Sequence, residues 1–192
     1  MLKLFKKKEK QNKVLSSMAN GKSVAIEDVP DEVFSTKMMG DGIAVIPDDG
    51  KIYAPCNGKI SMVMDNTKHA LGIETEDGME LLIHVGLDTV NLMGEGFATH
   101  VSAGDSVETG ELLISYDKTD FVTKGINDIT MLVIVENGGH EITKYNINEN
   151  VHSRISFNRI QIKSHQIDVV FLYCDKFFSN LVIDFVLLKI LL

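Results

Sequence analysis

Glycine turns recur at short intervals over most of this sequence, and their spacing leaves room only for short strands between them. The turn signals are Asp41-Gly42, Asp49-Gly50, Asn57-Gly58, Asp77-Gly78, Gly104-Asp105 and Gly110. Asp-Gly and Asn-Gly pairs favour tight hairpin turns, because these residues tolerate a positive φ. The β-rich runs between the turns are 42–46, 51–54, 59–64, 70–75, 79–85, 111–116 and 130–135. The pattern predicts an all-β fold, an antiparallel β-sandwich or barrel.

Helices should be few and short, because the stretch from 24 to 145 has no long apolar repeat of helical period. Residues 119–126 suggest a single helical turn. A weak internal echo links residues 40–44, Gly-Asp-Gly-Ile-Ala, to residues 94–98, Gly-Glu-Gly-Phe-Ala. A duplicated half-barrel would account for such an echo. We therefore expect a duplicated hybrid fold of the barrel-sandwich type.

Composition divides the chain into a flexible basic arm at 1–20, a β-rich domain at 21–163 and an apolar tail at 164–192. The tail contains neither glycine nor proline. Aspartate and lysine interrupt its apolar run, so it lacks the stretch of roughly eighteen apolar residues that spans a bilayer. Either it forms a buried or interfacial helix, or it is foreign to the fold.

The formal net charge of −8 argues against nucleic acid as a partner, because phosphate backbones are bound by clustered basic faces. Residues 1–13 are the exception, with six lysines and one glutamate beside Leu2, Leu4 and Phe5. We interpret this segment as a solvated terminus, and peripheral contact with an anionic membrane surface is the open alternative. It is not a signal peptide, since no apolar run follows the lysines. The two cysteines, Cys56 and Cys174, have no metal-ligand spacing and form no evident disulfide framework, and the second point favours a reducing cytoplasm.

Two histidines flank the Asp77-Gly78 turn. If these two residues form a two-residue hairpin loop, Leu71 faces His84 and His69 faces Gly86. Directly opposed residues share one face of a sheet, and so do residues two apart along a strand. His69 and His84 are then diagonal neighbours on the same face, within reach of each other. Gly86 would leave space beside the His84 ring for an added group.

Two neighbouring imidazoles suit phosphoryl transfer. A neutral imidazole nitrogen is nucleophilic near pH 7, and transfer through a loose transition state needs mainly positioning and charge stabilisation. One histidine can attack phosphorus while the other donates a hydrogen bond to the phosphoryl oxygens. Thr67 would lie on the same strand face as His69, where its hydroxyl could select the tautomer of that ring.

Two other interpretations stay open on the residues alone. A histidine on an apolar strand is often a satisfied core residue. A zinc site is the chemical competitor, because imidazole is a good zinc ligand. Zinc normally takes three or four protein ligands, however, and the sequence has no His-x-His or His-Glu-x-x-His motif. A catalytic zinc would have to recruit Asp88 or a distant residue.

These residues lie within text that resembles a known family, the glucose-type (type 1) enzyme IIA component of the bacterial phosphoenolpyruvate:sugar phosphotransferase system. The resemblance covers about 24–151. Its most specific blocks are Thr-Lys-His-Ala at 67–70 and Glu-Leu-Leu-Ile-His-Val-Gly-Leu-Asp-Thr-Val at 80–90. Further matching blocks are Ile-Glu-Asp-Val-Pro-Asp-Glu-Val-Phe at 26–34, Gly-Asp-Gly-Ile-Ala at 40–44, Tyr-Ala-Pro at 53–55 and Gly-Glu-Gly-Phe at 94–97.

The resemblance implies a cytoplasmic phosphocarrier that needs no cofactor. His84 would accept phosphoryl on Nε2 from the histidine carrier HPr and pass it to a cysteine of a sugar-permease IIB domain, whereas His69 would serve only onward transfer. The family also leaves room for a zinc ion shared with a partner's carboxylate at His69 and His84. The residues that we expect to dock partners are Phe34, Met64, Leu71, Leu82, Val85, Gly86 and Asp88.

The chain departs from the family near its C-terminus. Residues 151–154 lack the glycine of the family's closing turn, although 157–163 could still supply a strand. Beyond Ser164 the resemblance stops, and we hypothesise that the tail is read out of frame. Two competing functions remain: a zinc-dependent hydrolase on a related barrel-sandwich fold, and a regulatory module that binds transporters or metabolic enzymes.

Overall fold

The computed structural model describes residues 13–153 and 160–164, and its regular elements are almost all short strands. The strands are β1 (Lys13–Leu15), β2 (Gly21–Ala25), β3 (Asp41–Pro47), β4 (Lys51–Tyr53), β5 (Gly58–Val63), β6 (Ala70–Glu74), β7 (Met79–Val85), β8 (Phe97–Thr99), β9 (Ser106–Val107), β10 (Leu112–Tyr116), β11 (Thr130–Asn137), β12 (His140–Lys144), β13 (Asn150–Val151) and β14 (Ile160–Ser164). The helical segments are η1 (Ile26–Asp28), α1 (Glu32–Ser35), η2 (Thr89–Leu92) and α2 (Lys118–Thr123).

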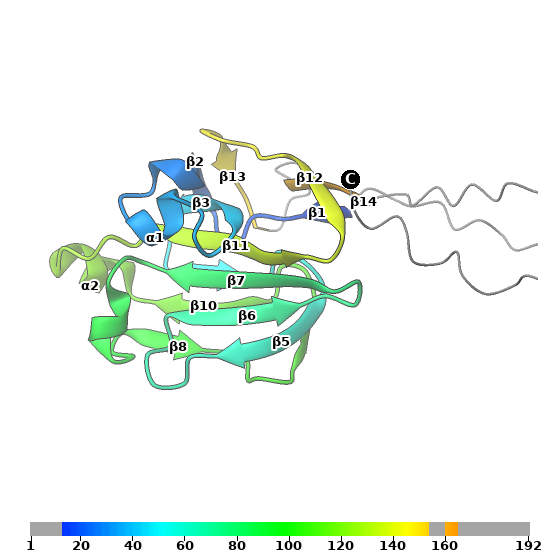
Figure 1. Cartoon of the computed structure of the whole chain (residues 1–192). Helices are drawn as coiled ribbons and strands as arrows, with labels where there is room; N and C mark the ends of the chain where they lie inside the picture. The colour runs from blue at the N-terminus through cyan, green and yellow to red at the C-terminus, as the bar shows by residue number, and fades with distance from the viewer. Residues whose placement is uncertain (1–12, 154–159, 165–192) are drawn as a thin grey trace, which may run out of the picture.

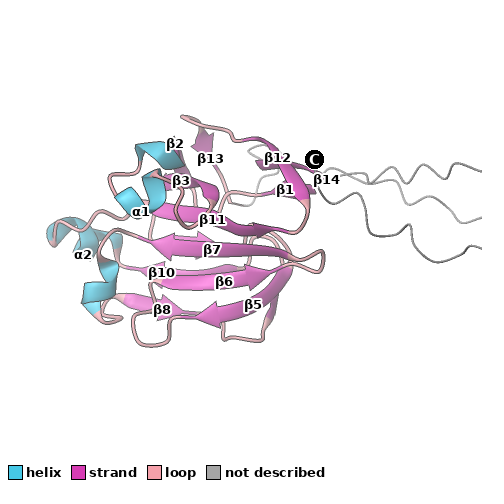
Figure 2. Ribbon diagram, in the orientation of Figure 1, coloured by secondary structure: helices cyan, strands magenta, loops and turns pink. Residues whose placement is uncertain are grey.

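The strands form one large antiparallel sheet and two small ones. The eight-stranded sheet has the order β13-β2-β3-β11-β7-β6-β5-β9, and the three-stranded sheets have the orders β4-β10-β8 and β1-β14-β12. Figure 1 shows β11, β7, β6 and β5 side by side, and Figure 2 shows α1 and α2 at one end of the strands. These features confirm the predicted all-β antiparallel fold with few short helices. No helix in the described part of the chain is long and apolar enough to cross a membrane.

Strand alternation separates the large sheet into two apolar faces. The inner face of β6 and β7 belongs to the main core, which includes Leu71, Ile73, Leu81 and Ile83. A smaller cluster lies on the outer face, where α1 and η1 contribute to it; its buried members are Ile26, Val29, Phe34, Ala44, Ile129, Met131 and Val133. The short helical segment α1 is therefore held against the outer face of the sheet by apolar packing.

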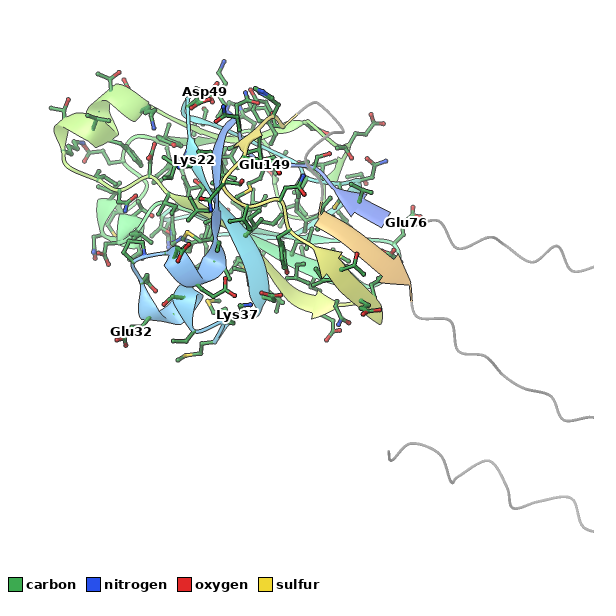
Figure 3. All side chains as sticks on the ribbon, turned by 90° about the horizontal axis from the view of Figure 1, so that it is seen from above. Lys22, Glu32, Lys37, Asp49, Glu76 and Glu149 are labelled. Carbon is green, nitrogen blue, oxygen red and sulfur yellow. The ribbon has the colours of Figure 1, made fainter. Side chains whose placement is uncertain are left out.

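The connection from α1 to β3 is tied down by charge as well as by packing. The Lys37 ammonium contacts the Glu27 carboxylate at 2.5 Å and the Asp41 carboxylate at 2.8 Å, which joins η1 to the start of β3. Asp31 caps α1, with Oδ1 accepting from the Val33 amide at 2.8 Å. Figure 3 shows Glu32 on the side of the domain away from Glu76 of the β6–β7 turn, with Lys37 along the lower edge.

The seven strands predicted from the sequence correspond to β3, β4, β5, β6, β7, β10 and β11, with limits that differ by at most two residues. The prediction missed β1, β2, β8, β9, β12 and β13. Strands β8, β9 and β13 have two or three residues each, too few to show alternation. The expected helical turn at 119–126 is α2, which begins one residue earlier because Asp117 is its cap and accepts from the Thr119 amide at 2.9 Å.

The domain begins before Gly21, the boundary predicted after a flexible arm at 1–20. Residues 13–15 form β1, and Leu15, Met18 and Ala19 are fully buried in the main core. These three apolar residues follow the basic segment 1–13, and they belong to the fold and not to a flexible arm. Residues 1–12 and the tail from 165 onward lie outside the described part of the chain. The expected strand near 157–163 corresponds to β14, which pairs with β1 and β12.

Candidate functional site

The β6–β7 hairpin has a different register from the one that the sequence predicted. The Thr75 amide donates to the Met79 carbonyl at 2.9 Å, so the loop contains three residues, 76–78. Gly78 has a φ of +82°, as expected for a three-residue loop that ends in a left-handed residue. His84 therefore pairs with Ala70 rather than with Leu71, and every cross-strand pair in the hairpin moves by one position.

The structure removes two residues from the expected docking surface. Leu71 pairs with Ile83, and both side chains point into the main core. Val85 follows His84 along β7 and therefore points to the opposite face. Leu71 and Val85 are each 0% exposed, so neither can contact a partner. The prediction that they dock partners is wrong. For Leu71 the cause is the register, because a shift of one residue moves a side chain to the other face of the sheet; for Val85 it is alternation along β7, which holds in either register.

His84 lies on the outer face, in a row that crosses four strands. Ala44 of β3 pairs with Met131 of β11, which pairs with His84, which in turn pairs with Ala70 of β6. Phe34 of α1 contacts the imidazole edge-on, with ring centroids 5.1 Å apart. The outer-face packing of α1 thus closes one side of the half-buried His84 ring.

His69 reaches His84 by a route that alternation does not describe. It lies just before β6, and its carbonyl accepts a hydrogen bond from the Val85 amide at 2.8 Å. A regular strand would direct His69 inward with Val85. Lys68 instead has a φ of +54°, which breaks the strand, and the His69 ring lies 4.7 Å from the His84 ring, centroid to centroid, at 80°. The predicted neighbourhood of the two rings exists, although the predicted pairing does not.

The backbone of Thr67 influences His69. Thr67 lies in the turn before β6, where its amide donates to the Met64 carbonyl at 3.1 Å. The Thr67 backbone raises the pKa of His69, but burial of the ring outweighs it and the pKa is lowered overall. Thr67 lies in a turn and not on the strand face that the sequence predicted.

The two rings are arranged so that one nitrogen of each is enclosed. Nδ1 of His69 and Nδ1 of His84 are both buried, and neither makes a hydrogen bond of normal geometry. The Gly86 backbone lies close enough to His84 to raise its pKa, yet burial and the neighbouring His69 lower that pKa to about 4. His84 is therefore neutral at pH 7. With Nδ1 enclosed, Nε2 is the nitrogen through which each ring can react.

The low pKa of His84 should make folding stability depend on pH. Between about pH 6.5 and pH 4 the unfolded chain binds a proton at this residue and the folded chain does not, so the free energy of unfolding falls as the pH falls. The difference amounts to about 3 kcal/mol. Chemical denaturation of wild type and His84→Gln at several pH values should show a steeper decline for wild type across that window. Parallel curves would contradict the assigned pKa.

Gly86 allows the backbone to turn sharply after β7. Its φ is +74°, and a Cβ there would approach Thr89 Cγ2 at 2.5 Å and the Asn127 carbonyl oxygen at 3.0 Å. Thr89 in turn donates from its hydroxyl to the Val85 carbonyl at 2.6 Å. The sequence predicted that Gly86 opens space for a group on His84. Its neighbours show that it instead permits close packing of the loop after β7.

Gly86→Ala should destabilise the protein by about 2–4 kcal/mol, because the left-handed backbone and the steric overlap both disfavour a side chain. Gly139→Ala is the matched control, since Gly139 has the same φ of +74° and a Cβ there would meet no atom within 4 Å. That control should cost only about 1–2 kcal/mol. Denaturation of both variants measures the difference, and equal losses would show that the contacts at Gly86 have no energetic effect.

The two histidines line an apolar cavity of about 540 Å³ on the outer face. Four of the expected docking residues line it, namely Phe34, Met64, Leu82 and Asp88. Sequence reasoning missed several more apolar residues of the lining: Val33, Met39, Met62, Val90 and Val135. Alternation outward from His84 along the paired strands would have found Met62 if the register had been known.

The site has few groups for a metal ion. In the ranges 13–153 and 160–164, no group of three or more His, Cys, Asp or Glu side chains gathers to hold one. His69 and His84 could supply two nitrogen ligands to zinc, which usually takes four. Any zinc bound there would need its remaining ligands from another molecule.

Comparison with known proteins identifies the family of the chain. The family model for EIIA 1 of the phosphoenolpyruvate-dependent sugar phosphotransferase system matches residues 13–139. The chain belongs to this family. The glucose permease IIA of Mycoplasma capricolum is 32% identical, with a TM-score of 0.70 over 80% of this chain and 96% of that one. Csd3 of Helicobacter pylori is 10% identical, with a TM-score of 0.36 over 80% of this chain and 36% of that one.

Membership of the EIIA family establishes the general activity. The protein is a phosphocarrier of the sugar phosphotransferase system, a phosphotransferase component that is phosphorylated on histidine. The family requires no cofactor, and its partners are HPr and IIB domains.

Proposed function

We propose that His84 is the residue that carries the phosphoryl group. Nε2 attacks the phosphorus of phosphorylated HPr; the new N–P bond forms as the bond to the carrier's histidine breaks, and the freed carrier imidazole keeps the electron pair. The observation that supports this assignment most directly is the environment of the ring. His84 is half-buried among apolar groups, its pKa of about 4 keeps it neutral at pH 7, and Nδ1 is enclosed.

His69 serves as the second imidazole of the transfer. Its ring lies edge-on to His84 at 4.7 Å, close enough to donate a hydrogen bond to an oxygen of a phosphoryl group on His84. Burial lowers the pKa of His69, so at pH 7 it carries one N–H and one lone pair. A neutral donor stabilises the phosphoryl oxygens without trapping the group as a tight ion pair, which favours onward transfer.

The cavity wall docks both partners in turn. Phe34, Met64, Leu82 and Asp88 are the predicted residues that line it. We assign HPr as the donor and the cysteine of a IIB domain as the acceptor, with the exchange taking place in the cytoplasm. An apolar face excludes water around the reacting atoms, and this exclusion protects the phosphohistidine from hydrolysis.

Incubation with phosphoenolpyruvate, enzyme I and HPr tests this function. The full chain should gain one phosphoryl group that is labile to acid and stable to alkali, as phosphohistidine is. Fragmentation should place it on the peptide that contains His84, and nuclear magnetic resonance should place it on Nε2. Labelling on another residue would overturn the assignment.

A charge on the cavity wall should weaken docking. Val90 lines the cavity and is exposed, so Val90→Asp is expected to raise the KM for phosphorylated HPr about tenfold, because the carboxylate loses water when the partner docks. Val122→Asp is the matched control, since Val122 is exposed on α2 and does not line the cavity. Steady-state labelling at varied concentrations of phosphorylated HPr gives the KM of each variant. An equal rise of KM in both variants would exclude this wall as the docking face.

A further inference from the structure

The methionines in the described part of the chain divide sharply by exposure. Met18, Met79 and Met131 are buried in the two cores. The exposed ones are Met38 at 76%, Met39 at 42%, Met62 at 38%, Met64 at 42% and Met93 at 70%. Three of these five, Met39, Met62 and Met64, line the cavity that holds His69 and His84, whereas Met38 and Met93 do not.

The fold brings these three thioethers together from separate elements. Met39 follows α1, and Met62 and Met64 lie on and just after β5. A register irregularity in β5 near Ser61 sets Met62 opposite Gly72 of β6. A Cβ on Gly72 would come within 2.9 Å of Met62 Cγ, so the missing side chain leaves room for Met62 to lie across β6. Gly72 pairs with Leu82, which places Met62 on the same face as His84.

We propose that Met39, Met62 and Met64 form an oxidation-sensitive rim through which peroxide switches off docking at the His84 cavity. This inference rests on the proposed function of that cavity. A thioether sulfur attacks one peroxide oxygen, so that an S–O bond forms and the O–O bond breaks. The proton of the transferred oxygen moves to the departing hydroxide, which leaves as water. Sulfur loses two electrons and hydrogen peroxide gains them, giving methionine sulfoxide.

Oxidation changes the property on which docking depends. Methionine is apolar and adaptable, which suits a surface that must bind two different partners in turn. Its sulfoxide is polar, and a docked partner would bury the new oxygen without a hydrogen bond. The buried methionines are protected by the core, so the fold should survive mild peroxide. Methionine sulfoxide reductases reverse the modification, which makes the change a switch rather than damage.

Peroxide treatment of the full chain tests this proposal. Peptide mass spectrometry would establish which methionines are oxidised, and the initial rate of labelling by phosphorylated HPr would be measured before and after treatment. Each variant is compared with its own untreated rate. Wild type and the matched control M38L/M93L should lose at least about tenfold in kcat/KM, whereas M39L/M62L/M64L should lose less than about twofold.

Two further measurements exclude other causes. Treatment with dithiothreitol alone reverses cysteine sulfenic acids and disulfides and should not restore the rate, whereas reductase with dithiothreitol should. The melting temperature of the oxidised protein should stay near that of the untreated one. Loss of fold, full activity with all three rim residues oxidised, or equal loss in M39L/M62L/M64L would each overturn the proposal. If untreated wild type is not labelled at all, the proposed function fails instead.

Discussion

His84→Gln is expected to abolish phosphorylation of this protein by phosphorylated HPr. Glutamine fills much of the space of the imidazole beside Phe34, but its amide nitrogen has no available lone pair to attack phosphorus. We do not expect His69 to be phosphorylated instead, because the phosphorus of the docked donor would face the position that His84 Nε2 occupies in wild type. The rate of labelling should fall by at least about 10³-fold, as when the nucleophile of a covalent mechanism is removed.

The control for this result is His100→Gln. His100 lies outside the cavity lining, and its Nε2 contacts the Ser115 hydroxyl at 2.8 Å on an exposed surface. This variant should be labelled at the wild-type rate. At pH 7 both variants should show a cooperative unfolding transition in denaturant, which would establish that their fold is intact. If His84→Gln is labelled as fast as wild type, another residue carries the phosphoryl group.

His69→Gln should separate the two half-reactions. Acceptance from HPr requires the His84 nucleophile, which this substitution leaves in place, so the labelling rate should change by less than about tenfold. Release to a IIB cysteine should slow by about 100-fold, since a donor aimed at the transferring oxygens is displaced. The edge-on contact of the two rings at 4.7 Å is the geometry on which this expectation depends.

A chase experiment measures the effect at His69. The labelled variant is isolated, mixed with an isolated IIB domain, and the loss of label is followed on a rapid-quench time scale. Thr67→Val is the companion variant, because Thr67 acts on His69 through its backbone and a new side chain should leave transfer within about threefold of wild type. Equal slowing of acceptance and release in His69→Gln would mean that His69 only supports the shape of the site.

The hairpin shows how far turn chemistry can be read and where the reading ends. Asp77-Gly78 marks the turn between β6 and β7, and both strands lie within one residue of their expected limits. The same dipeptide is compatible with loops of two or three residues, and only the Thr75–Met79 pairing selects the longer one. The alternative moves Leu71 between the surface and the core, and for that reason the docking surface was partly mispredicted.

The geometry of the site could likewise be predicted only in part. The neighbourhood of His69 and His84 could be expected from their distance along a hairpin, but the actual approach uses a left-handed Lys68 that no residue pattern marks. Lysine is not a residue that favours positive φ, so the conformation is imposed by its surroundings. Met62 joins the cavity because β5 is irregular near Ser61 and because Gly72 has no side chain. Both features depend on the partner strand.

The sequence by itself determined the fold class, the positions of the main strands and turns, and the two histidines at the centre of the site. These properties depend on local chemistry: glycine in turns, apolar alternation in strands, and imidazole as a nucleophile near neutral pH. The tertiary structure alone decided which face each residue occupies, which nitrogen of each ring is enclosed, and which methionines join the cavity. Those outcomes depend on strand register and on contacts between distant segments, because a shift of one residue reverses every side chain in a strand.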